Sequence, residues 1–372
     1  MPGRGVSPVS GFEFDPSFGL RHSSLFQRPD GGSGDFEVND TILLAHGGGG
    51  SLTRALVEEL VVPGFSNPAL NRLDDSALVE IDGTRLAMTT DSYVVSPLFF
   101  PGGDIGKLAV CGTINDLAVA GARPLYLTLS LVIEEGLPIE TLRTVLRSAA
   151  ETAREAGVQI VTGDTKVIER GKADKLFINT AGVGVPLKGV SVASANARCG
   201  ARVIINGPIG DHGIAVISRR EGIEFKTPVT SDVAPLWSLV EKVLAVCPDV
   251  QAMKDATRGG LAAVLNEIAA ASKVSVLIRE RDVPVREAVR GACDLFGYDP
   301  LYVANEGKVV IFCPAERAAA VLAVMREHPL GRDAALIGEV IEGRAGQVLM
   351  DTSIGGRRIV DMPYGEQLPR IC

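Results

Sequence analysis

The stretch that decides the fold class is residues 138–161, PIETLRTVLRSAAETAREAGVQIV. Behind Pro138, a residue that the first turn of a helix accepts, apolar side chains recur at helical spacing at Leu142, Val145, Leu146 and Ala149. This pattern predicts an amphipathic helix over residues 138–156 that ends at Gly157, followed by a strand at 158–161. A helix that passes directly into a β-rich run is typical of layered folds in which helices cover sheets.

The same alternation continues on both sides of this stretch. Strands are predicted at residues 42–44, 85–88, 203–205 and 274–278, and helices at residues 232–246 and 261–268. The alternation predicts an α/β (α+β) architecture and argues against a helical bundle or a β-sandwich.

The length of 372 residues suggests two domains, because one domain usually holds about 100 to 200 residues. Residues 1–40 contain Gly31-Gly32-Ser33-Gly34 and no sustained hydrophobic period, so we expect a disordered N-terminal extension there. The expected boundaries are then an N-terminal α/β domain at residues 41–190, a C-terminal one at 191–360, and a flexible tail at 361–372.

Composition excludes several classes of protein. The net charge of −8, from 45 acidic and 37 basic residues, argues against a dedicated binder of nucleic acid or of anionic membranes. No apolar run approaches the roughly 18 residues that span a bilayer, and the first residues lack the apolar core of a secretory signal. We therefore expect a cytoplasmic protein without a membrane partner.

The six cysteines fall into two groups. None forms a CxxC pair, and the first five are expected to be buried, reduced thiols: Cys111, Cys199, Cys247, Cys293 and Cys313. Cys372 is the last residue, where there is no core for it to fill. The proline-containing segment 363–372 reaches about 30 Å when extended, so it is able to carry a thiol between its own active site and another protein.

Five aspartates next to apparent element ends form an oxygen-rich set: Asp75, Asp91, Asp116, Asp164 and Asp255. Such a set without a histidine or cysteine cluster suits Mg²⁺ that bridges phosphates, and it makes zinc improbable. The alternative for each aspartate alone is a turn former or a helix N-cap. Only their number makes the metal interpretation competitive.

A run of four glycines, Gly47-Gly48-Gly49-Gly50, lies between the predicted strand that ends at His46 and a helical pattern over residues 51–60. Backbone N–H groups in such a loop approach phosphate oxygens closely, although a flexible surface loop explains four glycines about as well. A P-loop is absent, because Leu108 follows Gly106-Lys107 where serine or threonine is required.

Three further residues are candidates for acid–base chemistry. His46 is either a general acid–base group or a structural histidine. Lys166 and Glu306 lie in glycine-flanked segments beside apolar strands, where a solvated charge is the commoner explanation.

A family resemblance rests on segments that occur in order between residues 42 and 372. They are His46-Gly47-Gly48-Gly49-Gly50, Thr89-Thr90-Asp91-Ser92-Tyr93, Pro97-Leu98-Phe99-Phe100-Pro101-Gly102-Gly103, Asn115-Asp116, Val161-Thr162-Gly163-Asp164-Thr165-Lys166-Val167, Asp255-Ala256-Thr257-Arg258-Gly259-Gly260, Asn305-Glu306-Gly307-Lys308 and Pro369-Arg370-Ile371-Cys372. Together these segments resemble the HypE family of hydrogenase maturation factors. Residues 1–40 fall outside the resemblance.

The resemblance implies a two-domain fold of the aminoimidazole ribonucleotide synthetase (PurM-like) type with mixed sheets, and a homodimer built around the N-terminal sheets. It also implies a reaction. The carbamoyltransferase HypF would carbamoylate the terminal cysteine, ATP with Mg²⁺ would drive dehydration to a thiocyanate, and the cyanide would pass to iron on the HypC–HypD complex as a ligand for a [NiFe] hydrogenase.

Site roles follow from the same resemblance. Cys372 would carry the reacting group, with Glu306 as base and Lys166 orienting or protonating, two roles that can be exchanged; His46 is a further catalytic candidate. The nucleotide-binding candidates are Gly47, Gly48, Gly49, Gly50, Asn115, Asp164, Thr165 and Thr257, and the metal candidates are the five aspartates. The rival hypotheses are a non-catalytic iron-complex scaffold and an ATP-dependent small-molecule kinase of the same fold, which would leave Cys372 unexplained.

Overall fold

The computed structural model describes residues 41–223, 227–365, 368 and 370–372. The expected disordered extension at 1–40 lies outside the described residues. The described residues belong to one compact unit, so the expected domain boundaries near residues 190 and 360 stay predictions.

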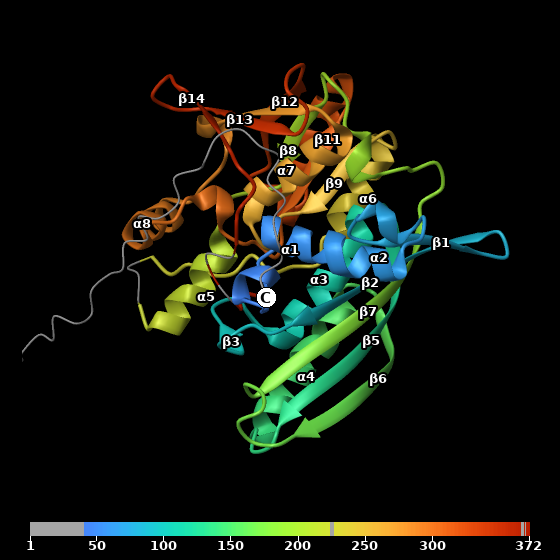
Figure 1. Ribbon diagram of the computed structural model, residues 1–372, viewed down its shortest axis with the longest axis vertical. Helices are drawn as coiled ribbons and strands as arrows, with labels where there is room; N and C mark the ends of the chain where they lie inside the picture. Colours follow the sequence, from blue (N-terminus) through green and yellow to red (C-terminus); the bar gives the residue numbers. More distant parts are fainter. Residues whose placement is uncertain (1–40, 224–226, 366–367, 369) are drawn as a thin grey trace, which may run out of the picture. The chain divides into compact units, whose positions relative to one another are not determined.

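The first half of the chain builds a five-stranded sheet in the order β1-β2-β7-β5-β6. Its strands are β1 (Ala77–Ile81), β2 (Thr84–Tyr93), β5 (Ala122–Glu134), β6 (Gln159–Ile168) and β7 (Leu176–Pro186). Only the β5–β6 pair is parallel. The helix α3 (Ile105–Val119) packs against β2, β5 and β7, and α4 (Ile139–Glu155) packs against α3 and β6 (Figure 1).

One face of this sheet has no helix on it. Along β7 buried and partly buried residues alternate, so Leu176 and Ile178 face the helices while Phe177 and Asn179 face the other way. Tyr126 and Val132 on β5 share that outward face and are exposed. Among the described residues, the outward face therefore carries a mixture of apolar and polar side chains, and the guanidinium of Arg370 lies over Phe177 on it.

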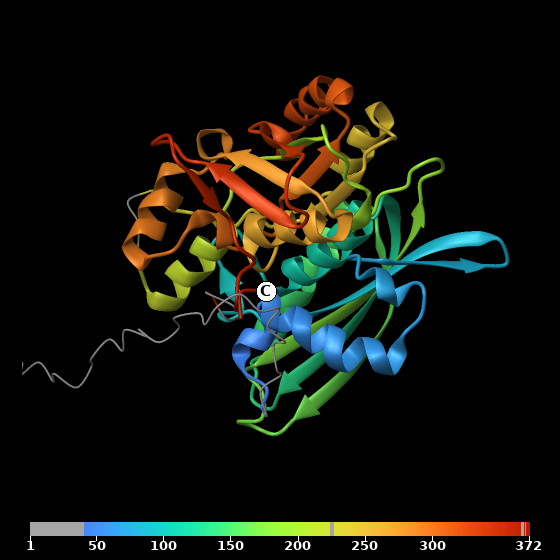
Figure 2. The same cartoon turned by 45° about the horizontal axis from the view of Figure 1, so that its top comes forward.

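The second half builds a seven-stranded mixed sheet in the order β14-β13-β10-β12-β8-β11-β9. The strands are β8 (Arg202–Ile205), β9 (Ala252–Asp255), β10 (Ser275–Arg279), β11 (Val309–Cys313), β12 (Ala335–Ile341), β13 (Gln347–Asp351) and β14 (Arg357–Ile359). The helices around it are α5 (Asp211–Glu221), α6 (Trp237–Val246), α7 (Gly260–Ser272), α8 (Glu287–Phe296) and α9 (Ala318–Arg326) (Figure 2).

Shorter elements lead into and connect these two halves. A 3₁₀ turn, Leu44–Gly47, is followed by α1 (Ser51–Leu56), a π-helical stretch Val57–Val61 and α2 (Val62–Phe65). The strands β3 (Phe99–Phe100) and β4 (Gly103–Asp104) form a small hairpin before α3.

The helix α3 connects the two halves physically. It is almost wholly buried, as expected of a mainly apolar helix with protein on every side, and its polar residues include Asn115 and Asp116. Besides the first sheet it packs against α6 and β9 of the second half. A residue on α3 therefore lies within reach of the end of β9, and this contact brings the candidate aspartates of both halves together.

Several predicted elements are confirmed. The helix at residues 138–156 is α4, with Pro138 as its N-cap residue, and the runs at 85–88, 158–161, 203–205, 261–268 and 274–278 belong to β2, β6, β8, α7 and β10.

Three sequence predictions are wrong. Residues 42–44 form no strand, because the chain coils at once into the 3₁₀ turn that contains His46. The helix predicted at 232–246 begins only at Trp237, since the side chain of Asp232 binds backbone N–H groups of another loop. Cys199 is exposed because it lies in a turn before β8, whereas Cys111, Cys247, Cys293 and Cys313 are buried as expected.

Candidate active site at the C-terminal cysteine

A polar cavity of about 240 Å³ lies between the two halves of the chain. Its lining comes from β2, α3, the end of β9, the start of α7, the loop before β11 and the last residue of the chain. The candidate residues that line it are Gly49, Asp75, Asp91, Asp116, Asp255, Thr257, Glu306 and Cys372. Residues far apart in the sequence thus meet at one cavity.

Carboxylates dominate the electrostatics of this cavity. Burial, together with the charges of neighbouring aspartates, raises the pKa of Asp116 well above its usual range. Burial and the nearby Asp75 raise the pKa of Asp255 to about 8. Burial, and then the charges of Asp255 and Asp91, raise the pKa of Glu306. The mutual repulsion of these groups gives the cavity a strong preference for a cation or for bound protons.

Lys254 is a buried cation that lines the cavity and that the sequence analysis did not identify. Its Nζ lies 2.8 Å from Asp75 Oδ1 and 2.6 Å from Glu267 Oε2, and its side chain is only 10% exposed. Burial opposes its charge, but the two carboxylates outweigh burial and raise its pKa. Asp75 belongs to the first half and Lys254 to β9 of the second, so this ion-pair triad ties the halves together beside the cavity.

The donor chemistry fits Mg²⁺ better than any softer metal, because every side-chain donor in the carboxylate set is an oxygen. In the part of the chain that the structure describes, no group of three or more histidine, cysteine, aspartate or glutamate residues closes around a single metal position. An ion here would therefore take only one or two protein carboxylates and complete its shell with water and phosphate oxygens, as Mg²⁺ commonly does.

The glycine run forms the edge of the cavity next to Arg258. Arg258 Nη1 donates to the carbonyl of Gly47 at 3.0 Å, and the Gly49 N–H donates to Thr53 Oγ1 at 2.9 Å. Gly49 has φ +74°, and a Cβ there would lie 2.8 Å from that of Arg258. Gly49 is the member of the run that lines the cavity; a side chain at Gly50 would meet the carbonyl oxygen of Pro363 at 2.2 Å. Glycine is thus required where the loop, Arg258 and the start of the tail meet.

The end of the tail is docked along residues 94–96. The N–H of Val94 donates to Cys372 O at 2.9 Å, and that of Ser96 donates to Arg370 O at 3.2 Å. Arg370 Nη1 donates to Asp174 Oδ2 at 2.7 Å, which lowers the pKa of Asp174. Both views place the C-terminus beside the N-terminal helices (Figures 1 and 2). The tail thus holds its last residue, Cys372, at the cavity.

Glu306 is the buried glutamate of the cavity and the candidate for a catalytic base. Its residue is 3% exposed, and its carbonyl accepts from Asn115 Nδ2 at 3.3 Å. Asn115, a nucleotide-binding candidate, does not line the cavity; its Oδ1 accepts from the N–H of Leu236 at 2.8 Å, so it holds the loop behind Glu306.

Other predicted site residues lie elsewhere in this chain. Asp164, Thr165 and Lys166 are exposed on β6, where Lys166 Nζ lies 2.8 Å from Asp164 Oδ2. His46 is buried, and its Nδ1 accepts from the N–H of Leu43 at 2.9 Å. Its Nε2 has no hydrogen-bond partner among the described residues, and His46 does not line the cavity.

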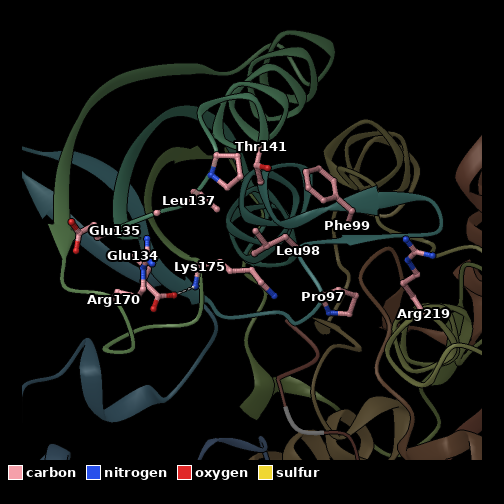
Figure 3. Close-up of a pocket in the computed structure, with 12 residues that line it drawn as sticks. Pro97, Leu98, Phe99, Glu134, Glu135, Leu137, Thr141, Arg170, Lys175 and Arg219 are labelled. Carbon is pink, nitrogen blue, oxygen red and sulfur yellow. Dashed lines mark hydrogen bonds between the residues drawn. The ribbon is translucent and has the colours of Figure 1, made fainter.

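A larger cavity of about 520 Å³ lies between Pro97, Leu137 and Arg219 (Figure 3). Its lining combines apolar residues with two acidic and three basic ones, Glu134, Glu135, Arg170, Lys175 and Arg219, and it contains none of the candidate site residues. The candidate residues that line a cavity therefore gather at the smaller, polar one.

Comparison with known proteins gives a consistent result. Two family models match, that of the AIR synthase related protein N-terminal domain at residues 73–186 and that of its C-terminal domain at residues 198–351. Carbamoyl dehydratase HypE from Azotobacter vinelandii is 51% identical over 334 residues, which is 90% of this chain and 98% of that protein.

The chain belongs to the HypE family. A crystal structure of hydrogenase maturation protein HypE in complex with ATP matches with a TM-score of 0.76 and 49% identity, over 89% of this chain and all of that one. A HypE–HypF complex matches with a TM-score of 0.79 and 48% identity, over 83% of this chain and 100% of that one. The two-domain α/β fold expected from the sequence is thereby confirmed. Within the described ranges, no helix combines the length and apolar character needed to cross a bilayer.

Proposed function

We propose that this protein is an ATP-dependent carbamoyl dehydratase that acts on its own C-terminal cysteine in [NiFe] hydrogenase maturation. The observation that carries the proposal is the position of Cys372, which lines the same cavity as Glu306 and the aspartates. A relative that matches over nearly its whole length is named carbamoyl dehydratase HypE, and a solved relative holds ATP.

The proposed reaction converts an S-carbamoyl group on Cys372 into a thiocyanate. The carbonyl oxygen of the carbamoyl group takes the γ-phosphoryl group of ATP, releases ADP and becomes part of a leaving group, while the nitrogen loses one proton. Removal of the second nitrogen proton then expels phosphate and leaves a carbon–nitrogen triple bond. One ATP and one thiocarbamate give one ADP, one phosphate and one thiocyanate.

Glu306 is the base that we assign to the proton transfers. Its raised pKa brings the carboxyl group closer to the operating pH, where a general base works best. Glu306 and Cys372 line the same cavity, which supports Glu306 as the base nearest to the carried group.

Magnesium is the metal that we propose for the nucleotide. Asp75, Asp91, Asp116 and Asp255 line the cavity as candidate ligands. A bound cation would offset the carboxylate repulsion that, after burial, raises the pKa values of Asp116 and Asp255. When bound, Mg²⁺ would neutralise the phosphate charge. Thr257 and Gly49 line the same cavity as nucleotide contacts.

The partners follow from the position of the carrier thiol. HypF would supply the carbamoyl group, as the HypE–HypF complex of a relative supports, and the HypC–HypD complex would receive the cyanide for the active-site iron. Both transfers require the tail to leave its docked position, a gating motion of the kind that often accompanies catalysis. The six free cysteines favour the reducing cytoplasm as the place of this work.

A homodimer through the five-stranded sheet is also part of the proposal. The outward face of that sheet exposes Tyr126 and Val132, and the register pairs Val132 with Lys166. Lys166 and Asp164 therefore lie on the face that a second copy would cover. Their assigned roles, in the tail-cysteine pocket and at the metal, depend on that second protomer.

ATP turnover separates the enzyme from its rivals. We expect carbamoylated protein to release one phosphate for each modified cysteine, and uncarbamoylated protein or Cys372→Ala to release almost none. An iron-complex scaffold would release no phosphate in any form. A small-molecule kinase would turn over ATP with its metabolite whether or not Cys372 is present.

A further inference from the structure

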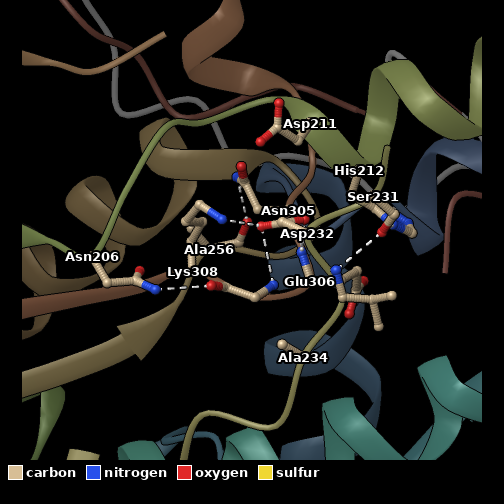
Figure 4. Close-up of polar contacts among 12 residues, drawn as sticks. Asn206, Asp211, His212, Ser231, Asp232, Ala234, Ala256, Asn305, Glu306 and Lys308 are labelled. Atoms are coloured by element: carbon tan, nitrogen blue, oxygen red, sulfur yellow. Dashed lines mark hydrogen bonds and ion pairs between the residues drawn. The ribbon is translucent and has the colours of Figure 1, made fainter. Parts of the chain in front are cut away.

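The loop at residues 231–236, directly before α6, contacts His212 on one side and the segment that carries Glu306 on the other (Figure 4). One of its own anchors is the N–H of Ser231, which donates to the carbonyl of Pro101 at 2.8 Å. Another is the N–H of Leu236, which donates to Asn115 Oδ1 on α3. The loop is therefore fixed to the first half of the chain at both ends.

The tail contact runs through His212 in α5. His212 Nε2 lies 2.8 Å from the carbonyl oxygen of Ile371, the residue before the carrier cysteine, and Nδ1 lies 2.8 Å from Ser231 Oγ. A carbonyl only accepts, so Nε2 carries the proton and Nδ1 accepts from the Ser231 hydroxyl. Burial lowers the pKa of His212 and keeps the ring in this neutral form. Phe100 packs edge-on against the ring at 5.3 Å.

The Glu306 contact runs through Asp232, the next residue of the loop. Asp232 Oδ1 accepts from the N–H of Glu306 and Oδ2 from that of Gly307, both at 3.1 Å, and Lys308 Nζ lies 2.7 Å from Oδ2. A Cβ on Gly307 would meet the carbonyl oxygen of Asp232 at 1.9 Å. The two backbones therefore touch with no room for a side chain.

We propose that His212 is a positioning residue: it fixes the tail so that the group on Cys372 meets Glu306, with residues 231–236 as the support common to both. This inference rests on the proposed dehydration. It adds the residue that sets the position of the Cys372 thiol relative to Glu306. His212 touches neither the reacting group nor the nucleotide in this account; it acts through the Ile371 carbonyl.

Two variants of His212 separate positioning from bulk packing. His212→Leu puts an apolar side chain of moderate size in place of the ring and removes the donor to Ile371. His212→Gln places an amide N–H close to the position of Nε2 and is expected to restore that bond. His328→Gln is the matched control, because His328 is a buried histidine that binds Ser238 and does not contact the tail.

The first readout is the rate at which a maleimide labels Cys372, divided by the rate at the exposed Cys199 of the same molecule. One lost hydrogen bond predicts a ratio about threefold to tenfold higher in His212→Leu, because the tail leaves its docked position more often. In His212→Gln and His328→Gln the ratio should stay within about twofold of its wild-type value. An unchanged ratio in His212→Leu would overturn the inference.

The second readout is the single-turnover rate of dehydration in carbamoylated protein at saturating ATP. His212→Leu should lower this rate by a similar factor while the Kd for ATP stays the same, and His212→Gln should recover it. A normal rate in His212→Leu contradicts the positioning role. If carbamoylated wild-type protein performs no dehydration, the proposed function fails. The labelling ratio then still decides whether His212 holds the tail.

Discussion

Replacing Lys254 by methionine tests the charge balance of the cavity. The change removes the cation of a buried triad and leaves Asp75 and Glu267 without it. Breaking a buried ion pair by removing one partner costs about 3 to 5 kcal/mol of folding free energy, and we expect about 3 kcal/mol because Glu267 is 32% exposed. Methionine keeps most of the volume of the side chain, so the loss measures charge rather than packing.

The pH dependence of that loss has a definite sign. Burial already raises the pKa of Asp75 although Lys254 opposes it, and without Lys254 the pKa rises further. The native variant then binds protons more tightly than its unfolded chain, so its stability falls as pH rises. The difference in unfolding free energy between wild-type protein and Lys254→Met should be largest near pH 8. It should shrink toward about pH 4, where an aspartate is half protonated even in the unfolded chain.

Urea unfolding at several pH values measures this difference. Arg317→Met is the control, because its partner Asp249 is 50% exposed and such a surface pair is worth about 0 to 1 kcal/mol. A loss below about 1 kcal/mol for Lys254→Met at pH 8, or a loss that grows as pH falls, would refute the electrostatic reasoning.

The remaining predictions concern the reacting groups. Gly307→Ala should cost about 1 to 3 kcal/mol and slow dehydration, because its Cβ has no space against Asp232; normal stability and rate would show that the loop shifts freely. Cys372→Ala should bind ATP normally but accept no carbamoyl group, as ATP titration and intact mass will show. Mixing inactive Lys166→Ala with inactive Cys372→Ala should restore dehydration if the proposed dimer shares Lys166 across its interface; mixtures that stay inactive would contradict that sharing.

Local patterns predicted the layered fold because they are visible over short stretches. The helix α4 has one apolar face and one charged face, and a proline and a glycine mark its ends. Residues 232–236 were misread as helix because their sequence has a helical period, while the bonds that Asp232 makes to Glu306 and Gly307 come from a segment about 70 residues away in the sequence. No local pattern reports a contact of that range.

The candidate site was predicted where a motif carried it. Asp91, Asp116, Asp255 and Glu306 stand in recognisable segments and do meet at the cavity. Lys254 was missed because a lysine beside an aspartate looks like a solvated charge, and only the fold shows that Asp75 and Glu267 bury it. A basic residue at the end of a buried strand, directly before a predicted metal ligand, was the one sequence signal available.

His212 shows the same limit from another direction. It precedes a glycine within α5, and nothing near it in sequence indicates the tail. Its contact with Ile371 spans 159 residues, so the fold alone reveals it.

The central claim is that ATP converts a carbamoyl group on Cys372 into a thiocyanate, and intact mass measurement tests it most directly. Carbamoylated protein incubated with Mg-ATP should lose the mass of one water, and peptide mapping should place that loss at Cys372. An unchanged mass, in protein that is folded and binds ATP, would contradict the account.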